Sequence, residues 1–154
     1  MLIGKERDQV PGGYCKPGAQ LVVVYGRRRI GKTELLLKFT SGKPYVYFLC
    51  ERTTVEKNMS KLAAKMASYL GKESFSRIPF RDLEDILKEF AEWKQSPERV
   101  VVVLDELPYL IELDPGVPST LQKVWDEVLS RRSDIMLVLC GSSVGMMETE
   151  VLGV

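Results

Sequence analysis

A phosphate-binding motif is the clearest chemical feature of this sequence. Residues 26–33 read GRRRIGKT and match the pattern GxxxxGK[S/T] directly after an apolar run. Glycine at both ends of such a loop lets backbone N–H groups approach phosphate oxygens. Lys32 then brings a positive charge to the β and γ phosphates, and Thr33 brings a hydroxyl to Mg²⁺. The motif therefore predicts binding of a nucleoside triphosphate with magnesium.

The nucleotide-binding residues come from this loop and from the start of the helix that follows it, where the helix dipole favours phosphate. We expect ATP or ADP to contact Gly26, Ile30, Gly31, Lys32, Thr33 and Glu34. We also count Lys32 as catalytic, because its charge lies beside the phosphate that is transferred.

Two carboxylates follow a second apolar run, at residues 100–104. A run of this kind is typical of a strand buried on both faces, and ligands bind at the carboxyl ends of the strands in an open parallel sheet. Asp105 fits the Walker B role and holds Mg²⁺ mainly through water. Glu106 is placed to orient or deprotonate the attacking water, which predicts a hydrolase. The alternative, an ordinary solvated turn, is disfavoured by the phosphate loop upstream.

A third apolar run, at 135–140, ends in two serines. We expect Ser142, in preference to Ser143, to lie near the γ phosphate. Residues 141–145 also match GxSxG, the nucleophile motif of serine hydrolases. The chain contains no histidine, so this sequence cannot supply a Ser-His-Asp triad.

Composition limits the remaining classes of function. The 154 residues are 45% hydrophobic, which suits one domain, and the net charge of +1 gives no indication of nucleic acid binding. The three cysteines are widely spaced and are expected to be reduced packing residues. No apolar run approaches the 18 residues of a membrane span and the N-terminus becomes charged early, so we expect a cytoplasmic protein with no membrane partner.

Strands that alternate with helices must position these groups. Strands are expected at 21–25, 44–50, 100–104 and 135–140, and helices after the phosphate loop, after a capping pattern at 53–56, at 82–93 and at 118–131. This order predicts a doubly wound α/β fold with a mainly parallel sheet and helices on both faces. Residues 1–19 contain two Pro-Gly steps and are expected to be an irregular lead-in to a nucleotide-binding core at 20–154.

Three blocks of sequence together resemble the archaeal ATPase family, a branch of the AAA+/STAND P-loop ATPases. The blocks are 26–36, 104–110 and 140–147, and the resemblance covers about residues 20–154. It implies an archaeal source and an ATP-dependent switch, with Gly31, Lys32 and Thr33 on the nucleotide, Asp105 on magnesium, Glu106 in catalysis and Ser142 at the sensor 1 position.

Two departures from the family pattern affect what the resemblance implies. The family's opening element is altered here, because Pro11 soon follows Ile3 to Arg7, so recognition of the adenine is not predicted. Family members also continue into a fifth strand, a helical lid and usually a winged-helix domain. We therefore expect an incomplete core in which the strand at 21–25 is an exposed apolar edge. This predicts a homo-oligomer, a strand-exchanged dimer or poor solubility.

Two functions from different classes fit these residues. The first is a magnesium-dependent ATPase with slow turnover, since an arginine from a lid or partner is worth about 10³–10⁵ in rate. The second is a nucleotide-binding switch or scaffold that does not turn over by itself and signals through a protein partner. Glu106 favours the first, because a binding module has no need of a carboxylate beside the magnesium ligand. A DNA-processing ATPase is a third reading, disfavoured by the near-neutral charge.

Overall fold

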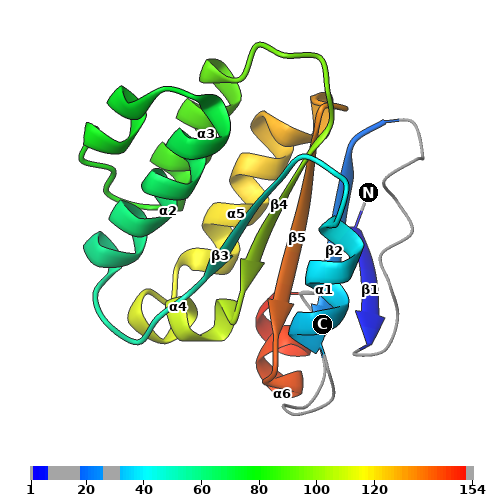
Figure 1. Cartoon of the computed structure of the whole chain (residues 1–154). Coiled ribbons are helices and arrows are strands. Elements are labelled where there is room, and N and C mark those ends of the chain that lie inside the picture. The colour runs from blue at the N-terminus through cyan, green and yellow to red at the C-terminus, as the bar shows by residue number, and fades with distance from the viewer. Residues whose placement is uncertain (1, 7–17, 26–31, 152–154) are drawn as a thin grey trace.

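A five-stranded parallel sheet forms the centre of the structure, a computed structural model that describes residues 2–6, 18–25 and 32–151. The strands are β1 (Leu2–Glu6), β2 (Gln20–Tyr25), β3 (Tyr45–Leu49), β4 (Val100–Asp105) and β5 (Ile135–Gly141). They lie in the order β1-β2-β5-β4-β3, and each neighbouring pair is parallel (Figure 1). The prediction of a mainly parallel α/β fold is confirmed.

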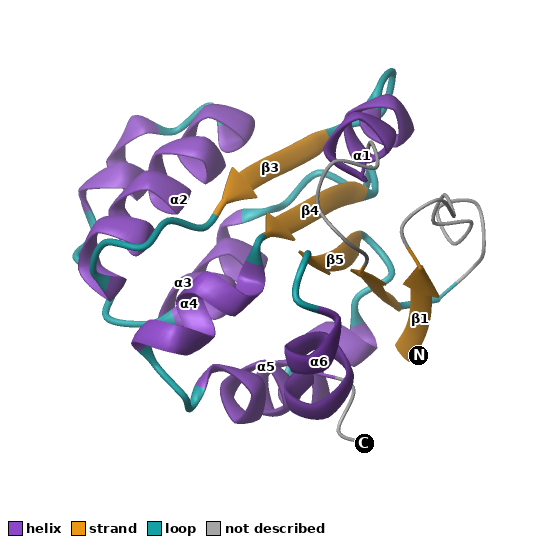
Figure 2. Cartoon of the chain, turned by 90° about the horizontal axis from the view of Figure 1, so that it is seen from below, coloured by secondary structure: helices purple, strands orange, loops and turns teal. Residues whose placement is uncertain are grey.

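Helices cover both faces of this sheet. They are α1 (Lys32–Thr40), α2 (Val55–Leu70), α3 (Leu83–Trp93), α4 (Leu107–Leu113), α5 (Val117–Glu127) and the short α6 (Val144–Met146). Helix α1 lies on one face, whereas α2, α3 and α5 lie on the other (Figures 1 and 2). Helix α4 follows β4 directly and lies at the carboxyl end of the sheet, where the predicted site is expected.

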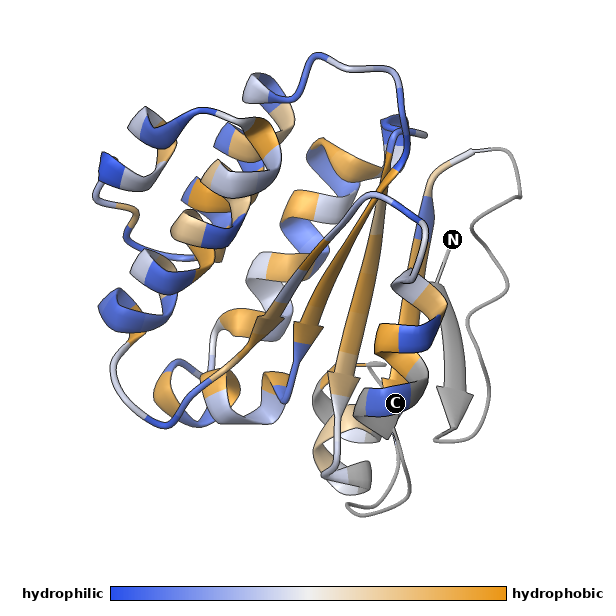
Figure 3. Cartoon of the chain, viewed as in Figure 1, coloured by the Kyte–Doolittle hydropathy of each residue, from blue (hydrophilic) through white to orange (hydrophobic). Residues whose placement is uncertain are grey.

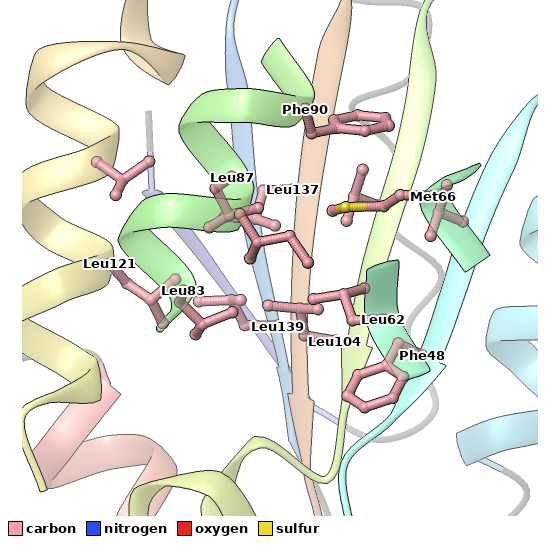
Figure 4. Close-up of a cluster of buried hydrophobic side chains, with 14 of the residues drawn as sticks. Phe48, Leu62, Met66, Leu83, Leu87, Phe90, Leu104, Leu121, Leu137 and Leu139 are labelled. Carbon is pink, nitrogen blue, oxygen red and sulfur yellow. The ribbon is translucent and has the colours of Figure 1, made fainter. Parts of the chain in front are cut away.

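The apolar core forms two layers, one on each face of the sheet. Alternate residues of β4 point to opposite sides, so that Val101 and Val103 pack with Leu36 and Phe39 of α1, whereas Leu104 joins the larger cluster. Strands β4 and β5 are apolar along most of their lengths, and the helices carry both polar and apolar residues (Figure 3). The larger cluster includes side chains from β3, β4, β5 and from α2, α3 and α5, which are shown in Figure 4.

Side-chain hydrogen bonds cap the N-termini of α2 and α3. The Oγ1 of Thr54 accepts a hydrogen bond from the Lys57 N–H and caps α2, and Asp82 caps α3 through the Asp85 N–H. The capping pattern that we expected at 53–56 is therefore displaced by one residue. The last predicted helix is shorter than expected, because α5 ends at Glu127 and a 3₁₀ turn, Leu129–Arg131, follows it.

The N-terminal residues differ from our expectation. We expected no regular element in residues 1–19, but Leu2–Glu6 form β1 and pair in parallel with β2 from Leu21 to Tyr25. An edge strand is held by backbone hydrogen bonds on one side and tolerates charged residues, so it needs no long apolar run. Strand β2 is consequently flanked on both sides, and the prediction that it is an exposed edge is wrong. The oligomeric state stays a prediction, without that argument for it.

Candidate functional site

The carboxyl ends of the central strands lie together and define the candidate site. Tyr25 at the end of β2 pairs with Gly141 at the end of β5, and Leu104 of β4 pairs with Leu139. Figure 2 views the sheet from this end, with α4 and α6 beside it. The predicted carboxylates and serine therefore come from adjacent strands that end at the same level.

The predicted phosphate loop connects β2 to α1 at this edge. Gly26, Ile30 and Gly31 lie outside the described residues, so their expected role stays a prediction. Lys32 and Thr33 begin α1, and their side chains also lie outside what is described. The side chain of Glu34, in the first turn of α1, is exposed.

Asp105 is a buried carboxylate, 1% exposed, at the last position of β4. The alternation along β4 places it on the same face as Val101 and Val103, which is the face that α1 covers. Its Oδ1 accepts a hydrogen bond from the Glu106 N–H at 2.8 Å, and its Oδ2 accepts one from the Tyr47 hydroxyl at 2.5 Å. The carboxylate is thus held by a hydrogen bond at each oxygen.

Glu106 has an unusual backbone conformation. Its φ of 53° and ψ of 44° are left-handed, and it is the one non-glycine residue with positive φ in the described part of the chain. For an L-residue this conformation costs on the order of 1–2 kcal/mol, and such strain gathers at functional sites. The sharp turn ends β4 and starts α4 in a single step, and it sends the Glu106 side chain toward β5.

Ser142 holds that side chain. Its backbone N–H donates to Glu106 Oε1 at 3.0 Å, and its hydroxyl lies 2.9 Å from both carboxylate oxygens. Ser143 has a different role, because its Oγ accepts from the Met146 N–H at 3.4 Å at the start of α6. The two serines therefore have distinct partners, and Ser142, not Ser143, contacts the carboxylate of Glu106.

Gly141 lets this turn lie close to α4. A Cβ built on Gly141 would lie 2.7 Å from the Pro108 Cδ and 2.7 Å from the Met147 Sδ. Real Cβ atoms do not approach other atoms so closely, so glycine permits contact between the end of β5 and the first turn of α4. This contact keeps Ser142 and Glu106 within hydrogen-bonding distance.

A pocket of about 380 Å³ opens beside Glu106 and Ser142. Arg52 is the one cationic residue among the described residues that line it. The Arg52 guanidinium lies 4.3 Å from the centre of the Tyr109 ring, and its Nε donates to Glu112 Oε1 at 3.1 Å. Sequence reasoning gave no role to Arg52, Tyr109 or Glu112, although Tyr109 lies in the block 104–110 that carries the family resemblance.

The site concentrates negative charge. The pKa of the Cys50 thiol, at the end of β3, is raised to about 12. Burial is the main cause, and the negative charges of Asp105 and Glu106 add to it. A divalent cation or a cationic side chain would relieve this field.

Magnesium fits the carboxylate of Asp105. Within residues 2–6, 18–25 and 32–151, no three Asp, Glu or Cys side chains gather into a metal cage. Mg²⁺ prefers oxygen ligands and usually keeps several waters, bound through one or two carboxylates together with substrate phosphates. A single buried carboxylate at the carboxyl end of β4 suits that coordination.

None of the helices within residues 2–6, 18–25 and 32–151 has the length and apolar composition that a membrane span requires.

Comparisons with known proteins give a family match and two similar sequences. Residues 13–153 match a family described as an ATPase domain predominantly from Archaea. Two relatives, both from Methanocaldococcus jannaschii, are named as uncharacterized proteins. MJECL04 is 29% identical over 133 residues, which are 86% of this chain and 27% of that protein. MJ0424 is 35% identical over 96 residues, which are 58% of this chain and 84% of that protein.

Two solved structures have a similar fold. The Walker-type ATPase PABY2304 of Pyrococcus abyssi matches with a TM-score of 0.60 and 20% identity, over 83% of this chain and 42% of that one. The ORC2 protein of Aeropyrum pernix, in its ADPNP-ADP complexes, matches with a TM-score of 0.58 and 20% identity, over 89% of this chain and 39% of that one. This chain thus spans less than half of either solved protein.

Proposed function

This chain belongs to the family of ATPase domains found predominantly in Archaea, and from that membership we propose that it binds Mg-ATP and hydrolyses it slowly. The observation that carries the proposal is the end of β4, where buried Asp105 and strained Glu106 stand side by side at the carboxyl edge of the sheet. Strain and a buried carboxylate at the carboxyl edge of a parallel sheet are both typical of functional sites. The ADPNP-ADP complexes of the ORC2 neighbour support nucleotide as the ligand.

The proposed division of roles separates binding from chemistry. The phosphate loop, from Gly26 to Thr33, holds the phosphates, with Lys32 at the γ phosphate. Thr33 and Asp105 hold magnesium, Asp105 mainly through water, and the bound ion neutralises charge on the phosphates. Glu34 lies in the first turn of α1, beside this loop.

Glu106 orients the attacking water and accepts its proton in this proposal. Glu106 lines the pocket at the end of β4, and this pocket is open to water. Ser142 sets the position of that carboxylate through two donors. Turnover is expected to be slow, because the guanidinium of Arg52 is engaged by Glu112 and Tyr109, and an arginine on the γ phosphate is worth about 10³–10⁵ in rate.

One observation favours a second function, a nucleotide-dependent switch without turnover of its own. Ser142 donates its backbone N–H to Oε1 and its hydroxyl to Oε2 of Glu106. Protein donors therefore occupy a carboxylate that a hydrolase would present to water. If nucleotide binding does not release Glu106, the chain holds ATP and signals through a protein partner.

The deciding experiment is calorimetric titration of the 154-residue chain with Mg-ATP, with phosphate release followed in the same samples. We expect binding and slow release by the wild type, binding without release by Glu106→Gln, and loss of binding by Lys32→Ala. Binding without release by the wild type would favour the switch. Equal release by wild type and Glu106→Gln would contradict the catalytic role of Glu106, and absence of binding would contradict both functions.

A further inference from the structure

Tyr47 of β3 contacts the candidate magnesium ligand, although no motif of the sequence includes it. Its hydroxyl donates to Asp105 Oδ2 at 2.5 Å. In the parallel pairing of β3 with β4, Tyr47 lies opposite Val103 and therefore two residues before the level of Asp105. A strand rises about 3.3 Å per residue, so a tyrosine ring that lies along the strand spans this offset.

The ring and the carboxylate share one face of the sheet. Tyr47 is partly buried and packs against the apolar layer between the sheet and α1, which includes Val101 and Val103. Asp105 is buried on that same face, and its other oxygen accepts from the Glu106 N–H. The apolar packing holds the ring, and the hydroxyl of the ring and the Glu106 N–H together hold the carboxylate.

The plane of this carboxylate matters for a magnesium site. Mg²⁺ requires near-ideal octahedral geometry and keeps several bound water molecules. A carboxylate that binds the ion through these waters must therefore have its oxygens oriented toward them. Groups that orient metal ligands without touching the metal typically contribute 10- to 100-fold to metal affinity. A phenol is well suited here, because it donates a hydrogen bond and adds no charge.

We propose that Tyr47 is a positioning residue that orients Asp105 for magnesium and thereby makes nucleotide binding magnesium-dependent. The inference rests on the proposed function, since it assumes that Asp105 serves magnesium. Tyr47 does not contact the nucleotide in this proposal and acts only through the carboxylate.

The test compares Tyr47→Phe with Tyr45→Phe in the whole chain. Tyr47→Phe removes the hydroxyl and keeps the ring, whereas Tyr45 lies two residues away on the same face of β3 and is 45% exposed, which makes it a matched control. ATP binding is titrated by calorimetry in EDTA and over a series of Mg²⁺ concentrations. The measured quantity is the Mg²⁺ concentration at which ATP affinity reaches half of its magnesium-dependent increase. For Tyr47→Phe we expect this concentration to rise about 10-fold or more. ATP affinity in EDTA should be unchanged. Tyr45→Phe should match the wild type.

A double variant tests whether Tyr47 acts through Asp105. If it does, Tyr47→Phe should have no further effect on magnesium dependence once Asp105→Asn is present. Wild-type magnesium dependence in Tyr47→Phe would overturn the inference and leave the proposed function standing. So would equal loss of ATP affinity with and without magnesium, or a Tyr47→Phe effect that persists with Asp105→Asn. Absence of Mg-ATP binding by the wild type would instead overturn the proposed function and this inference with it.

Discussion

Ser142 donates its backbone N–H and its hydroxyl to the carboxylate of Glu106, across the ends of two adjacent strands. The contact joins the third predicted motif to the second and decides how the Glu106 side chain is presented. It also bears on the two candidate functions. In a hydrolase, the contact would orient the carboxylate for catalysis, whereas in a switch it would keep the carboxylate from activating water.

Replacing Ser142 tests which description holds. For a hydrolase, we expect Ser142→Ala to lower phosphate release by about 10²-fold while Mg-ATP binding persists, since one preoriented donor is lost from the site. Ser143→Ala is the control, because that hydroxyl caps α6 and lines the same pocket. A rise in release for Ser142→Ala would instead support the switch.

The left-handed backbone of Glu106 predicts that a glycine variant is more stable than an alanine variant at this position. Glu106→Gly and Glu106→Ala both remove the carboxylate, but only glycine adopts positive φ without steric cost. We expect the glycine variant to be more stable than the alanine variant by about 1 kcal/mol in urea unfolding, although glycine usually destabilises. Equal or reversed stabilities would show that the turn relaxes when the side chain is lost.

Lys94, which lies away from the site, should contribute strongly to the stability of the fold. Its side chain is fully buried, and its Nζ donates to the carbonyls of Ser96 and Glu98 and lies 3.2 Å from Asp134. Lys94→Met should lower the free energy of unfolding by about 2 kcal/mol, because it removes a buried ammonium that donates to two carbonyls and to Asp134.

The control for Lys94 is Lys123→Ala. Lys123 also pairs with a carboxylate, that of Glu84 at 2.9 Å, but it is 52% exposed. Its loss should cost less than about 1 kcal/mol. Similar losses for the two variants would contradict the distinction between a buried and an exposed ion pair.

Cys50 and Cys140, the cysteines within the described residues, should be inert in the folded protein. The pKa of Cys50 is raised to about 12, by burial first and then by Asp105 and Glu106, so its reactive thiolate is almost absent at pH 8. We expect iodoacetamide at pH 8 to leave Cys50 and the buried Cys140 unmodified in native protein and to label both in guanidinium, as mapped by peptide mass spectrometry. Rapid labelling of Cys50 under native conditions would contradict this.

The fold was largely predictable because four of its strands are continuous apolar runs. Residues of β4 and β5 are buried on both faces, and this is the pattern that marks interior parallel strands. Strand β1 was missed because it is short and ends in Lys5 and Glu6, which gives it no apolar periodicity. Helix α4 was also missed, since its seven residues are too few to show a helical repeat.

The site was predictable only in part. The sequence indicated that Asp105, Glu106 and Ser142 follow parallel strands, and their strands end together as expected. It could not indicate that Tyr47 reaches Asp105 or that Ser142 binds Glu106, because such contacts depend on strand order and register. The roles of the phosphate-loop residues stay predictions that the binding experiments test.

The central position of β4 and β5 has a consequence for hydrogen exchange. Amides in the edge strands β1 and β3 can exchange through local opening, whereas those in β4 and β5 are paired on both sides and buried throughout. Their exchange therefore requires opening of the whole domain. Asp105 and Ser142 are attached to the slowest-exchanging part of the molecule, so the geometry between them should persist through fluctuations that detach either edge.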